Sequence, residues 1–377
     1  MHFHYTVTQG DKFSDCIAQI EAFLPSETDS IILLATSDNT WNMNEVSDWL
    51  RQSKMPIAGG FFPGVIAAQE KYQHNTIVAL CSTRPLHKCL VNGLSKGENF
   101  IYAQLSQYIG AKEEGKPYLV LIDGLSQNIE RFTDVFYRTM GESTATIGGG
   151  AGSLDFIQKP CLFTENGIAE DAALIIELPS PLSVGIQHGW EICAGPHLVT
   201  ESCGVAVNQL NFTDALEIYR DEILAHSGIN LTEHDFFDVA KQFPLGIEKL
   251  DAEPLVRDPI QADGNTLICV GEVPQNAMIY LLQGHTQKLT EAAKLAASNA
   301  VEAHKRHYDT ALSTCFTVDC ISRVLFMDAD FTQELSSINS VLPEQVKHIG
   351  ILSLGEIGNV DSGPIEWLNK TTVVGVL

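Results

Sequence analysis

Apolar runs and helical spacings alternate along the first half of the chain. Residues 31–35 and 76–80 are short, continuous apolar runs of the kind that form buried strands. Between them, Val46 and Trp49 recur at helical spacing within residues 41–54, which predicts an amphipathic helix. This order indicates helices packed against a largely buried sheet.

The same order recurs further along the chain. Residues 118–122 and 172–176 are again apolar runs, and they flank a helical spacing over residues 129–140. The landmark glycines Gly60 and Gly149 lie 89 residues apart, each shortly after its helical segment. The sequence therefore predicts a duplicated strand–helix–glycine turn–strand unit in the N-terminal part.

The second half also mixes the two kinds of element. Strands are predicted over residues 182–207, 243–284, 313–327 and 371–377, and helices over 212–226 and 290–308. We place a boundary near residue 210, which gives domains 1–210 and 211–377. Because strands and helices alternate in both parts, the predicted fold class is α/β, mixed α and β, in two domains.

Composition narrows the class of protein. The 377 residues are 45% hydrophobic and 19% charged, which is typical of a folded globular chain rather than a disordered one. The net charge of −24 repels nucleic acid and anionic membrane surfaces, so we expect neither as a partner. Nine cysteines without a CxxC pair, no secretory signal and no membrane-spanning apolar run indicate reduced thiols and a cytoplasmic location.

Three short motifs favour plain structural roles. Residues 148–153 fit neither GxGxxG nor a P-loop, so we expect a turn or a close backbone approach there. Residues 93–97 match GxSxG, but their polar surroundings indicate a loop rather than a nucleophile elbow. His304 and His307 lie one helical turn apart with two cations between them, which favours a solvated helix face over a metal site.

A set of polar residues stands in apolar or glycine-rich stretches of the C-terminal part. It comprises Arg257, Cys320, Arg323, Glu356 and Asn369. An arginine and a glutamate together can hold the carboxylate and ammonium of a zwitterion, so these residues are candidate ligand-binding groups. The alternative is an internal ion pair that orders the core.

His188 is the candidate metal-binding residue. It lies between Gly185 and Gly189 and next to Trp190, so it is either a hydrogen-bonded core histidine or a ligand to a metal or haem iron.

Several segments, in order, resemble the FIST sensory proteins, with FIST N and FIST C regions, over nearly the whole chain. They include residues 148–152, 166–168, 188–190, 215–219, 243–247, 255–259, 271–274, 355–357 and 368–371. The chain departs from the family pattern at Leu368, where the family often has a histidine, and this weakens any ligand role for that position.

The resemblance implies a sensor rather than an enzyme. FIST proteins act beside histidine kinases and cyclic-di-GMP enzymes, and their proposed ligands are small molecules such as amino acids. The NosP subgroup binds haem b and senses nitric oxide through a partner kinase. If haem b binds, we expect His188 as the axial ligand, because Gly185 and Gly189 leave little bulk to block a flat porphyrin and Trp190 offers an aromatic face. His197, His304 and His307 are the fallback ligands.

We therefore expect a cytoplasmic small-ligand sensor that regulates a separate signalling enzyme, such as a histidine kinase or a cyclic-di-GMP enzyme, with haem-based nitric oxide sensing as one form. An amino-acid sensor without haem is the first alternative. A small-molecule enzyme that uses Cys320, Arg323 and Glu356 is the second, and an interaction protein without a ligand is the third.

Overall fold

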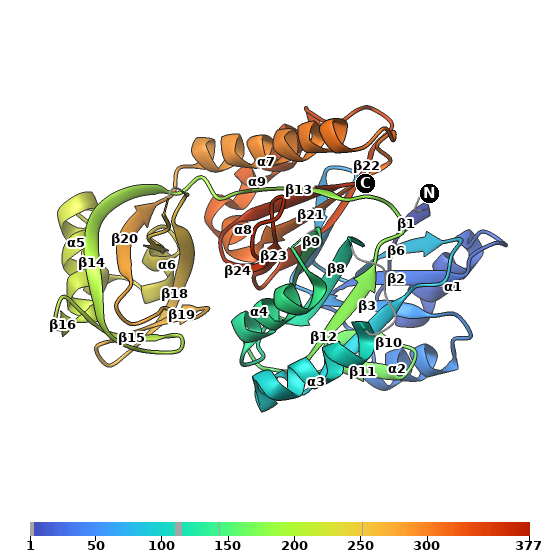
Figure 1. Cartoon of the computed structure of the whole chain (residues 1–377), viewed down its shortest axis with the longest axis horizontal. Coiled ribbons are helices and arrows are strands. Elements are labelled where there is room, and N and C mark those ends of the chain that lie inside the picture. The colour runs from blue at the N-terminus through green and yellow to red at the C-terminus, as the bar shows by residue number, and fades with distance from the viewer. Residues whose placement is uncertain (1–3, 110–114, 143, 251) are drawn as a thin grey trace.

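Three six-stranded sheets with one shared strand order form the larger part of the molecule (Figure 1). The computed structural model describes residues 4–109, 115–142, 144–250 and 252–377. Each sheet belongs mainly to one of three units: unit 1 spans residues 4–82, unit 2 spans 88–177, and unit 3 spans 183–187 with 286–376. The predicted mixed α/β class is confirmed.

The sheet of unit 1 has the order β1-β6-β2-β3-β10-β11. Its strands are β1 (His4–Gln9), β6 (Thr76–Ser82), β2 (Ser30–Thr36), β3 (Ile57–Phe62), β10 (Leu162–Thr164) and β11 (Gly167–Ala169). The central pair β2 and β3 is parallel, and every other pair in the sheet is antiparallel.

The other two sheets repeat this pattern. Unit 2 has β7 (Lys88–Asn92), β12 (Ala172–Glu177), β8 (Tyr118–Asp123), β9 (Thr146–Ala151), β23 (Glu356–Gly358) and β24 (Glu366–Leu368). Unit 3 has β13 (Ser183–Gln187), β25 (Thr372–Val376), β21 (Thr314–Cys320), β22 (Lys347–Ser353), β4 (Gly64–Ala67) and β5 (Glu70–Tyr72). The parallel pair is β8 with β9 in the sheet of unit 2, and β21 with β22 in the sheet of unit 3. The predicted duplication is confirmed, and the structure adds a third copy.

Each unit completes its neighbour's sheet with a hairpin. Hairpin β4–β5 of unit 1 extends the sheet of unit 3, β23–β24 of unit 3 extends that of unit 2, and β10–β11 of unit 2 extends that of unit 1. The exchange is cyclic and closes around a common centre. Without its borrowed hairpin, each sheet would expose the edge of its fourth strand, β3, β9 or β22, to solvent.

Three equivalent glycines allow the parallel strands to approach closely. A Cβ atom on Gly59 would lie 1.9 Å from the carbonyl oxygen of Leu33, and one on Gly148 would lie 1.8 Å from that of Val120. On Gly350 the corresponding distance is 2.1 Å. These glycines lie inside strands, so the prediction of a glycine turn is wrong. The alternative expectation, a close backbone approach, is what the structure shows at Gly148, and this contact requires the missing side chain.

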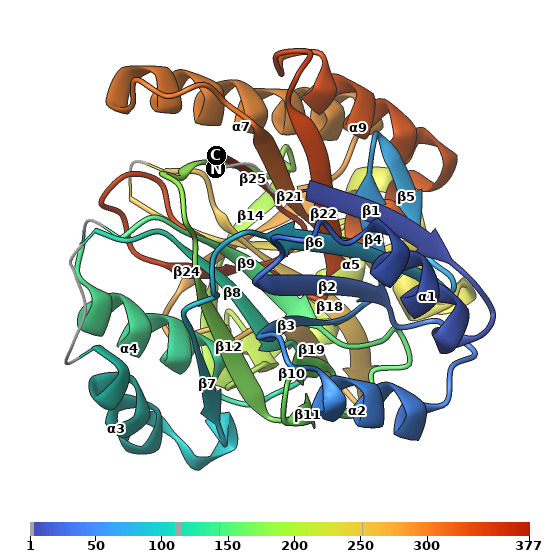
Figure 2. The same cartoon turned by 90° about the vertical axis from the view of Figure 1, so that its right-hand side faces the viewer.

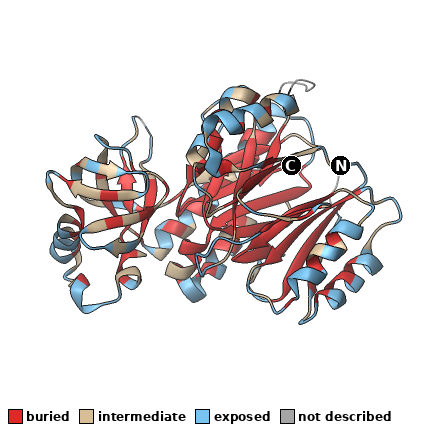
Figure 3. Ribbon diagram, turned by 90° about the horizontal axis from the view of Figure 1, so that it is seen from below, coloured by how far each residue is buried: buried red, intermediate tan, exposed pale blue. Residues whose placement is uncertain are grey.

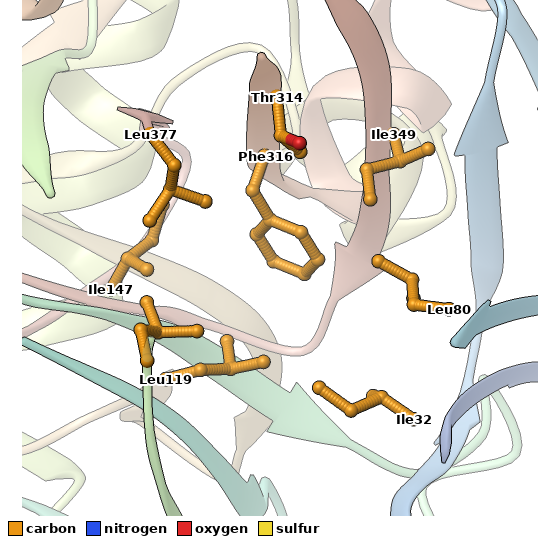
Figure 4. A pocket seen from close by; sticks show the side chains of 9 residues that line it. Ile32, Leu80, Leu119, Ile147, Thr314, Phe316, Ile349 and Leu377 are labelled. Carbon is orange, nitrogen blue, oxygen red and sulfur yellow. The ribbon is translucent and has the colours of Figure 1, made fainter. Parts of the chain in front are cut away.

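The three sheets meet at an apolar centre (Figure 4). Three residues hold the same position in the parallel strands β2, β8 and β21: Ile32, Leu119 and Phe316. Each directly precedes the residue that pairs with the equivalent glycine of the neighbouring strand. Their side chains line one void of about 20 Å³. Burial of these apolar side chains joins the three units into one body.

Helices cover the outer faces of the sheets (Figure 2). They are α1 (Phe13–Phe23), α2 (Met43–Gln52), α3 (Glu98–Ile109), α4 (Ile129–Met140), α7 (Thr286–His307), α8 (Ile321–Met327) and α9 (Phe331–Asn339). Figure 3 shows the strands buried and the outward sides of these helices exposed. Helix α7 packs so closely on β13 that a Cβ on Gly185 would lie 2.0 Å from the carbonyl oxygen of Ala296.

A seven-stranded sheet is inserted between β13 and α7 and lies at one end of the molecule (Figure 1). Its strands are β14 (Glu191–Cys203), β20 (Met278–Gln283), β17 (Leu245–Ile247), β18 (Leu255–Asp263), β19 (Thr266–Val270), β15 (Ala206–Leu210) and β16 (Thr213–Asp214). An additional β14–β15 pairing closes it into a barrel, which carries α5 (Ala215–Ser227) and α6 (Phe236–Ala240). We call residues 191–283 the barrel. The domain boundary near residue 210 stays a prediction, and strands on both sides of it pair within the barrel.

Two further expectations need correction. The predicted strand 313–327 ends at Cys320, because helix α8 begins at Ile321. The apolar stretch there is buried on all sides, so its periodicity does not distinguish helix from strand. His304 is 1% exposed and bonded through Nε2 to Thr310 Oγ1 at 3.0 Å, so the helix face carrying it is not solvated throughout.

We expect Gly148→Ala to destabilise the fold by at least about 3 kcal/mol, because the added methyl group must push β8 and β9 apart. Urea denaturation followed by circular dichroism measures the loss. Gly10→Ala is the control, since its Cβ would meet no heavy atom closer than 3.4 Å. Equal stability of the two variants would contradict the close-contact explanation.

Candidate functional site

A pocket of about 590 Å³ opens between units 1 and 2, at the carboxyl ends of β2, β3, β8 and β9. We call it the strand-end pocket. Its walls come from the β2–α2 connection, the start of α2, Phe61 of β3, the end of β8, β11 and residues 152–161 between β9 and β10. The carboxyl ends of parallel strands are the usual place for ligands in α/β proteins.

Two aromatic side chains form one wall of the pocket. Trp41 donates its indole N–H to the carbonyl oxygen of Gly10 at 2.9 Å and packs against Phe13 with ring centroids 5.7 Å apart. Phe61 is held edge-on against Phe163 at 4.6 Å. Both lining rings are therefore fixed by contacts behind them, which gives the pocket a rigid apolar surface.

Asp123 organises the polar side. This carboxylate ends β8, is 1% exposed, and accepts hydrogen bonds from the backbone N–H of Leu125 (3.1 Å) and of Asp171 (2.8 Å). It also accepts from Nε2 of Gln158 at 2.8 Å, and Gln158 belongs to the β9–β10 segment. The buried carboxylate thus ties the covering segment to the end of the strand.

Residues 152–161 form a lid loop over the pocket. Asp155 accepts hydrogen bonds from Ser153 Oγ at 2.5 Å and from the Ile157 N–H at 3.0 Å, and it forms an ion pair with Lys159. The Lys159 ammonium, followed by these two donors, lowers the pKa of Asp155 to about 2. The loop therefore presents a carboxylate and an ammonium to the pocket at neutral pH.

The side chain at one equivalent position differs between the three units. Ile168 of β11 lines it, and by strand register Trp367 of β24 and Lys71 of β5 hold the equivalent positions. Trp367 is 3% exposed and packs on glycine backbone, since a Cβ on Gly355 would lie 2.2 Å from its ring. At the edge of the unit 2 sheet, the Trp367 indole thus occupies the place that corresponds to the strand-end pocket beside Ile168.

The lid loop is also specific to this position. Between β9 and β10 the chain has residues 152–161, whereas Pro63 alone separates β3 from β4. Only Leu354 and Gly355 separate β22 from β23. A small side chain at position 168 and a long covering loop occur together at one of three otherwise equivalent interfaces.

The structure brings the predicted polar residues together as a buried network. Arg323 is 0% exposed and bonds both oxygens of Glu334 at 3.1 and 2.7 Å, and its Nε lies 3.2 Å from Asp319. Its other N–H groups donate to the carbonyl oxygens of His188 and Leu289. The guanidinium is fully paired inside the protein. This arrangement agrees with the alternative of an internal ion pair that orders the core.

Lys370 is a member of this network that the sequence patterns did not single out. It is 0% exposed, donates to Ser322 Oγ at 2.6 Å and lies 3.2 Å from Asp258 of the barrel. Its ammonium also lies 4.9 Å from the Trp190 ring centroid. The signal available in the sequence was only a lysine next to the already selected Asn369.

Glu356 and Cys320 are buried beside this network. Burial raises the pKa of Glu356 to about 8, and its oxygens accept from Ser353 Oγ (2.8 Å) and the Thr371 N–H (3.2 Å). Burial, then the nearby Glu356 and Asp258, raise the pKa of the Cys320 thiol well above its usual value. The thiol is therefore protonated at neutral pH, which makes it a poor nucleophile.

Arg257 and Asn369 lie where the barrel meets unit 2. Arg257 donates to the carbonyl oxygens of Glu272 (2.9 Å) and Trp367 (3.2 Å) and to Asn369 Oδ1 (3.4 Å). Asn369 and Cys320 line a void of about 20 Å³, which has room for a water molecule but not for an amino acid. A ligand role for the five predicted residues stays a prediction.

His188 does not present a free nitrogen lone pair to a metal. Its Nδ1 accepts the backbone N–H of Trp190 at 2.9 Å, so the neutral ring carries its proton on Nε2. Burial, followed by the charge of Arg323, lowers the pKa of His188 to about 4 and keeps the ring neutral. Nε2 lies 3.4 Å from Glu253 at the side of a cavity of about 300 Å³. In this arrangement the residue does not fit the role of haem ligand.

The fallback histidines and the other motifs are placed as follows. Nε2 of His197 lies 3.0 Å from Glu222, on the barrel. Residues 93–97 do lie between a strand, β7, and a helix, α3, contrary to expectation, but Ser95 Oγ donates to the carboxylate of Asp171 at 2.6 Å. Within the described residues, no group of three or more His, Cys, Asp or Glu side chains is arranged to hold a metal ion.

The fold defines a protein of mixed α/β architecture, and comparisons with known proteins identify its family. The FIST N domain model matches residues 30–212, and the FIST C domain model matches residues 215–359. The chain therefore belongs to the FIST family, whose domains are described as small-ligand sensory domains of signalling proteins. A search of curated proteins found no significant match.

The pocket residues were not found from the sequence. Asp123 ends an apolar strand run, and a polar residue at that place was the available signal. Trp41 and Ile168 carried no such signal. Their role depends on the approach of unit 2's hairpin to unit 1, which no local pattern records.

We expect Arg323→Ala to destabilise the protein by about 3–5 kcal/mol, because it leaves Asp319 and Glu334 buried without their cation. Chemical denaturation measures this loss. Arg131→Ala, on the exposed side of α4, is the control. A stable Arg323→Ala protein that has lost only ligand binding would support the zwitterion alternative instead.

We expect His188→Ala to leave haem affinity and the Soret band unchanged, because Nδ1 of His188 accepts the Trp190 N–H and the neutral ring carries its proton on Nε2. Haem titration of both proteins, followed by absorption spectroscopy, makes the comparison. Loss of a Soret band in the variant alone would show that His188 reorients to bind iron.

Proposed function

We propose that this protein is a cytoplasmic small-ligand sensor that regulates a separate signalling enzyme, such as a histidine kinase or a cyclic-di-GMP enzyme, and that the strand-end pocket binds its ligand. The observation that carries the proposal is the open interface between units 1 and 2, where Ile168 stands in the place of Trp367. In the described residues no helix is long and apolar enough to cross a membrane.

Membership of the FIST family supports the sensory part of the proposal. A sensor needs a ligand that binds one conformation better than another, not a reaction. The pocket volume of about 590 Å³ lies within the range of small-molecule sites.

The pocket chemistry favours an amino acid without haem. The Asp155–Lys159 pair offers a carboxylate for an α-ammonium group and an ammonium for an α-carboxylate. The aromatic wall of Trp41 and Phe61 provides an apolar surface for a side chain.

Haem-based nitric oxide sensing is the finer alternative that the family resemblance motivates. A Soret band in freshly purified protein would support it. The enzyme alternative would need a thiolate at Cys320, and the raised pKa of that thiol disfavours one.

We expect Ile168→Trp to weaken ligand binding by at least about tenfold, because the larger side chain occupies the space that Trp367 occupies in unit 2. Calorimetric titration of each of the twenty amino acids into the parent protein and the variant makes the comparison. Ile168→Val is the matched control and keeps the pocket open.

Two results would count against this site. If an amino acid binds the Ile168→Trp protein as tightly as the parent, the ligand lies elsewhere. If none of the twenty binds the parent protein, the amino-acid ligand is wrong.

A further inference from the structure

The lid loop has two faces, and they meet different parts of the molecule. Ser153, Asp155, Ile157 and Lys159 line the strand-end pocket. Phe156, between them, instead lines the void of about 20 Å³ that separates the loop from the barrel. Successive residues of one loop therefore border the pocket and the barrel.

The barrel side of that void is built by three elements. Phe237 comes from α6, Ile260 from β18 and Val270 from β19. The void also touches Asp258 and Ser322, so it adjoins the buried Lys370 network that joins barrel and core. Phe156 thus lies at the contact between the barrel and the three-unit body.

The loop is held mainly by its pocket-facing side chains. In the described part of the chain, the backbone of residues 154–160 makes no hydrogen bond to any other element. Asp155 and the Gln158–Asp123 bond fix its shape. A change at the pocket can therefore alter the whole loop.

Phe156 is in a conformation that its neighbours must maintain. Its φ of 52° is in the left-handed region, which a bulky side chain rarely adopts and which costs on the order of 1–2 kcal/mol. It is also 44% exposed, so burial alone does not hold it in place. When the Asp155 contacts are lost, the residue gains by leaving this conformation.

Noncovalent contacts and two chain connections attach the barrel to the three-unit body. Outside the void it meets the core through charged pairs, Lys249 with Glu366 at 2.7 Å and Arg257 with Glu130 at 3.8 Å. Val256 and Leu282 of the barrel also belong to a buried apolar cluster that includes residues of the core. Covalently it is joined only through residues 188–190 and 284–285. With only these two connections, the position of the barrel is set by its noncovalent contacts, and the contact at Phe156 is one of them.

We propose that the lid loop transmits ligand binding to the barrel: a ligand that competes for the Asp155–Lys159 pair releases Phe156 from the barrel face. This inference rests on the proposed function, and it names the regulation of that site. The barrel is then the part whose position reports occupancy of the strand-end pocket.

The test removes the loop's pocket-side anchor without any ligand. Asp155→Ala should speed amide hydrogen exchange in the barrel segments 236–240 and 255–270 by roughly tenfold, as measured by mass spectrometry. Leu154→Ala is the matched control, because Leu154 is exposed and lines neither cavity. It should leave exchange in the barrel unchanged.

A double variant identifies Phe156 as the connecting residue. If the effect passes through Phe156, the double variant should show the same amide exchange rates in the barrel segments as Phe156→Ala alone. Faster exchange confined to residues 152–161 would overturn the proposal, as would a barrel effect of Asp155→Ala that persists without the Phe156 ring. Neither outcome depends on a ligand, so the ligand titrations of Ile168→Trp can fail or succeed independently.

Discussion

Cyclic exchange of hairpins is the constraint on which the rest of the structure depends. Each of the three sheets ends in a hairpin supplied by another unit, through β3–β10, β9–β23 and β22–β4 pairing. An isolated unit would expose unpaired backbone groups along that edge, so the three units are expected to fold together. The apolar centre at Ile32, Leu119 and Phe316 adds burial to the same arrangement.

Function follows from departures from this regular arrangement. The interface of units 1 and 2 has a small Ile168 and a long lid loop, where the interface of units 2 and 3 has Trp367 and a short connection. Unit 3 carries the barrel between its first strand and its helix α7. Repetition supplies the scaffold, and the open interface between units 1 and 2 supplies a place for a ligand.

Charged residues in the interior have a different role. Arg323, Asp319 and Glu334 satisfy one another, and Lys370 joins Asp258 of the barrel to Ser322 of the core. Such groups cost solvation free energy and are retained where they fix one arrangement of the parts around them. Here they lie at the attachment of the barrel, close to Phe156, whose movement would reach them first.

Local patterns determined much of the secondary structure and the first repeat. The helix over residues 129–140 was predicted with its actual bounds, and the offset between Gly60 and Gly149 revealed the shared unit. Both succeed because periodicity and spacing are properties of contiguous residues. Charges in apolar stretches must find partners, and Arg323, chosen on that ground, is paired with Asp319 and Glu334.

Only the tertiary structure decided which interface is open and what each polar group faces. The third unit was hidden because residues 191–283 interrupt it, and the strand to helix change at Cys320 was hidden because both segments are buried. Ile168 lies opposite Trp41 and Asp123 only after unit 2 lends its hairpin to unit 1. Contacts between residues more than a hundred positions apart depend on that exchange, and no local pattern in the sequence encodes it.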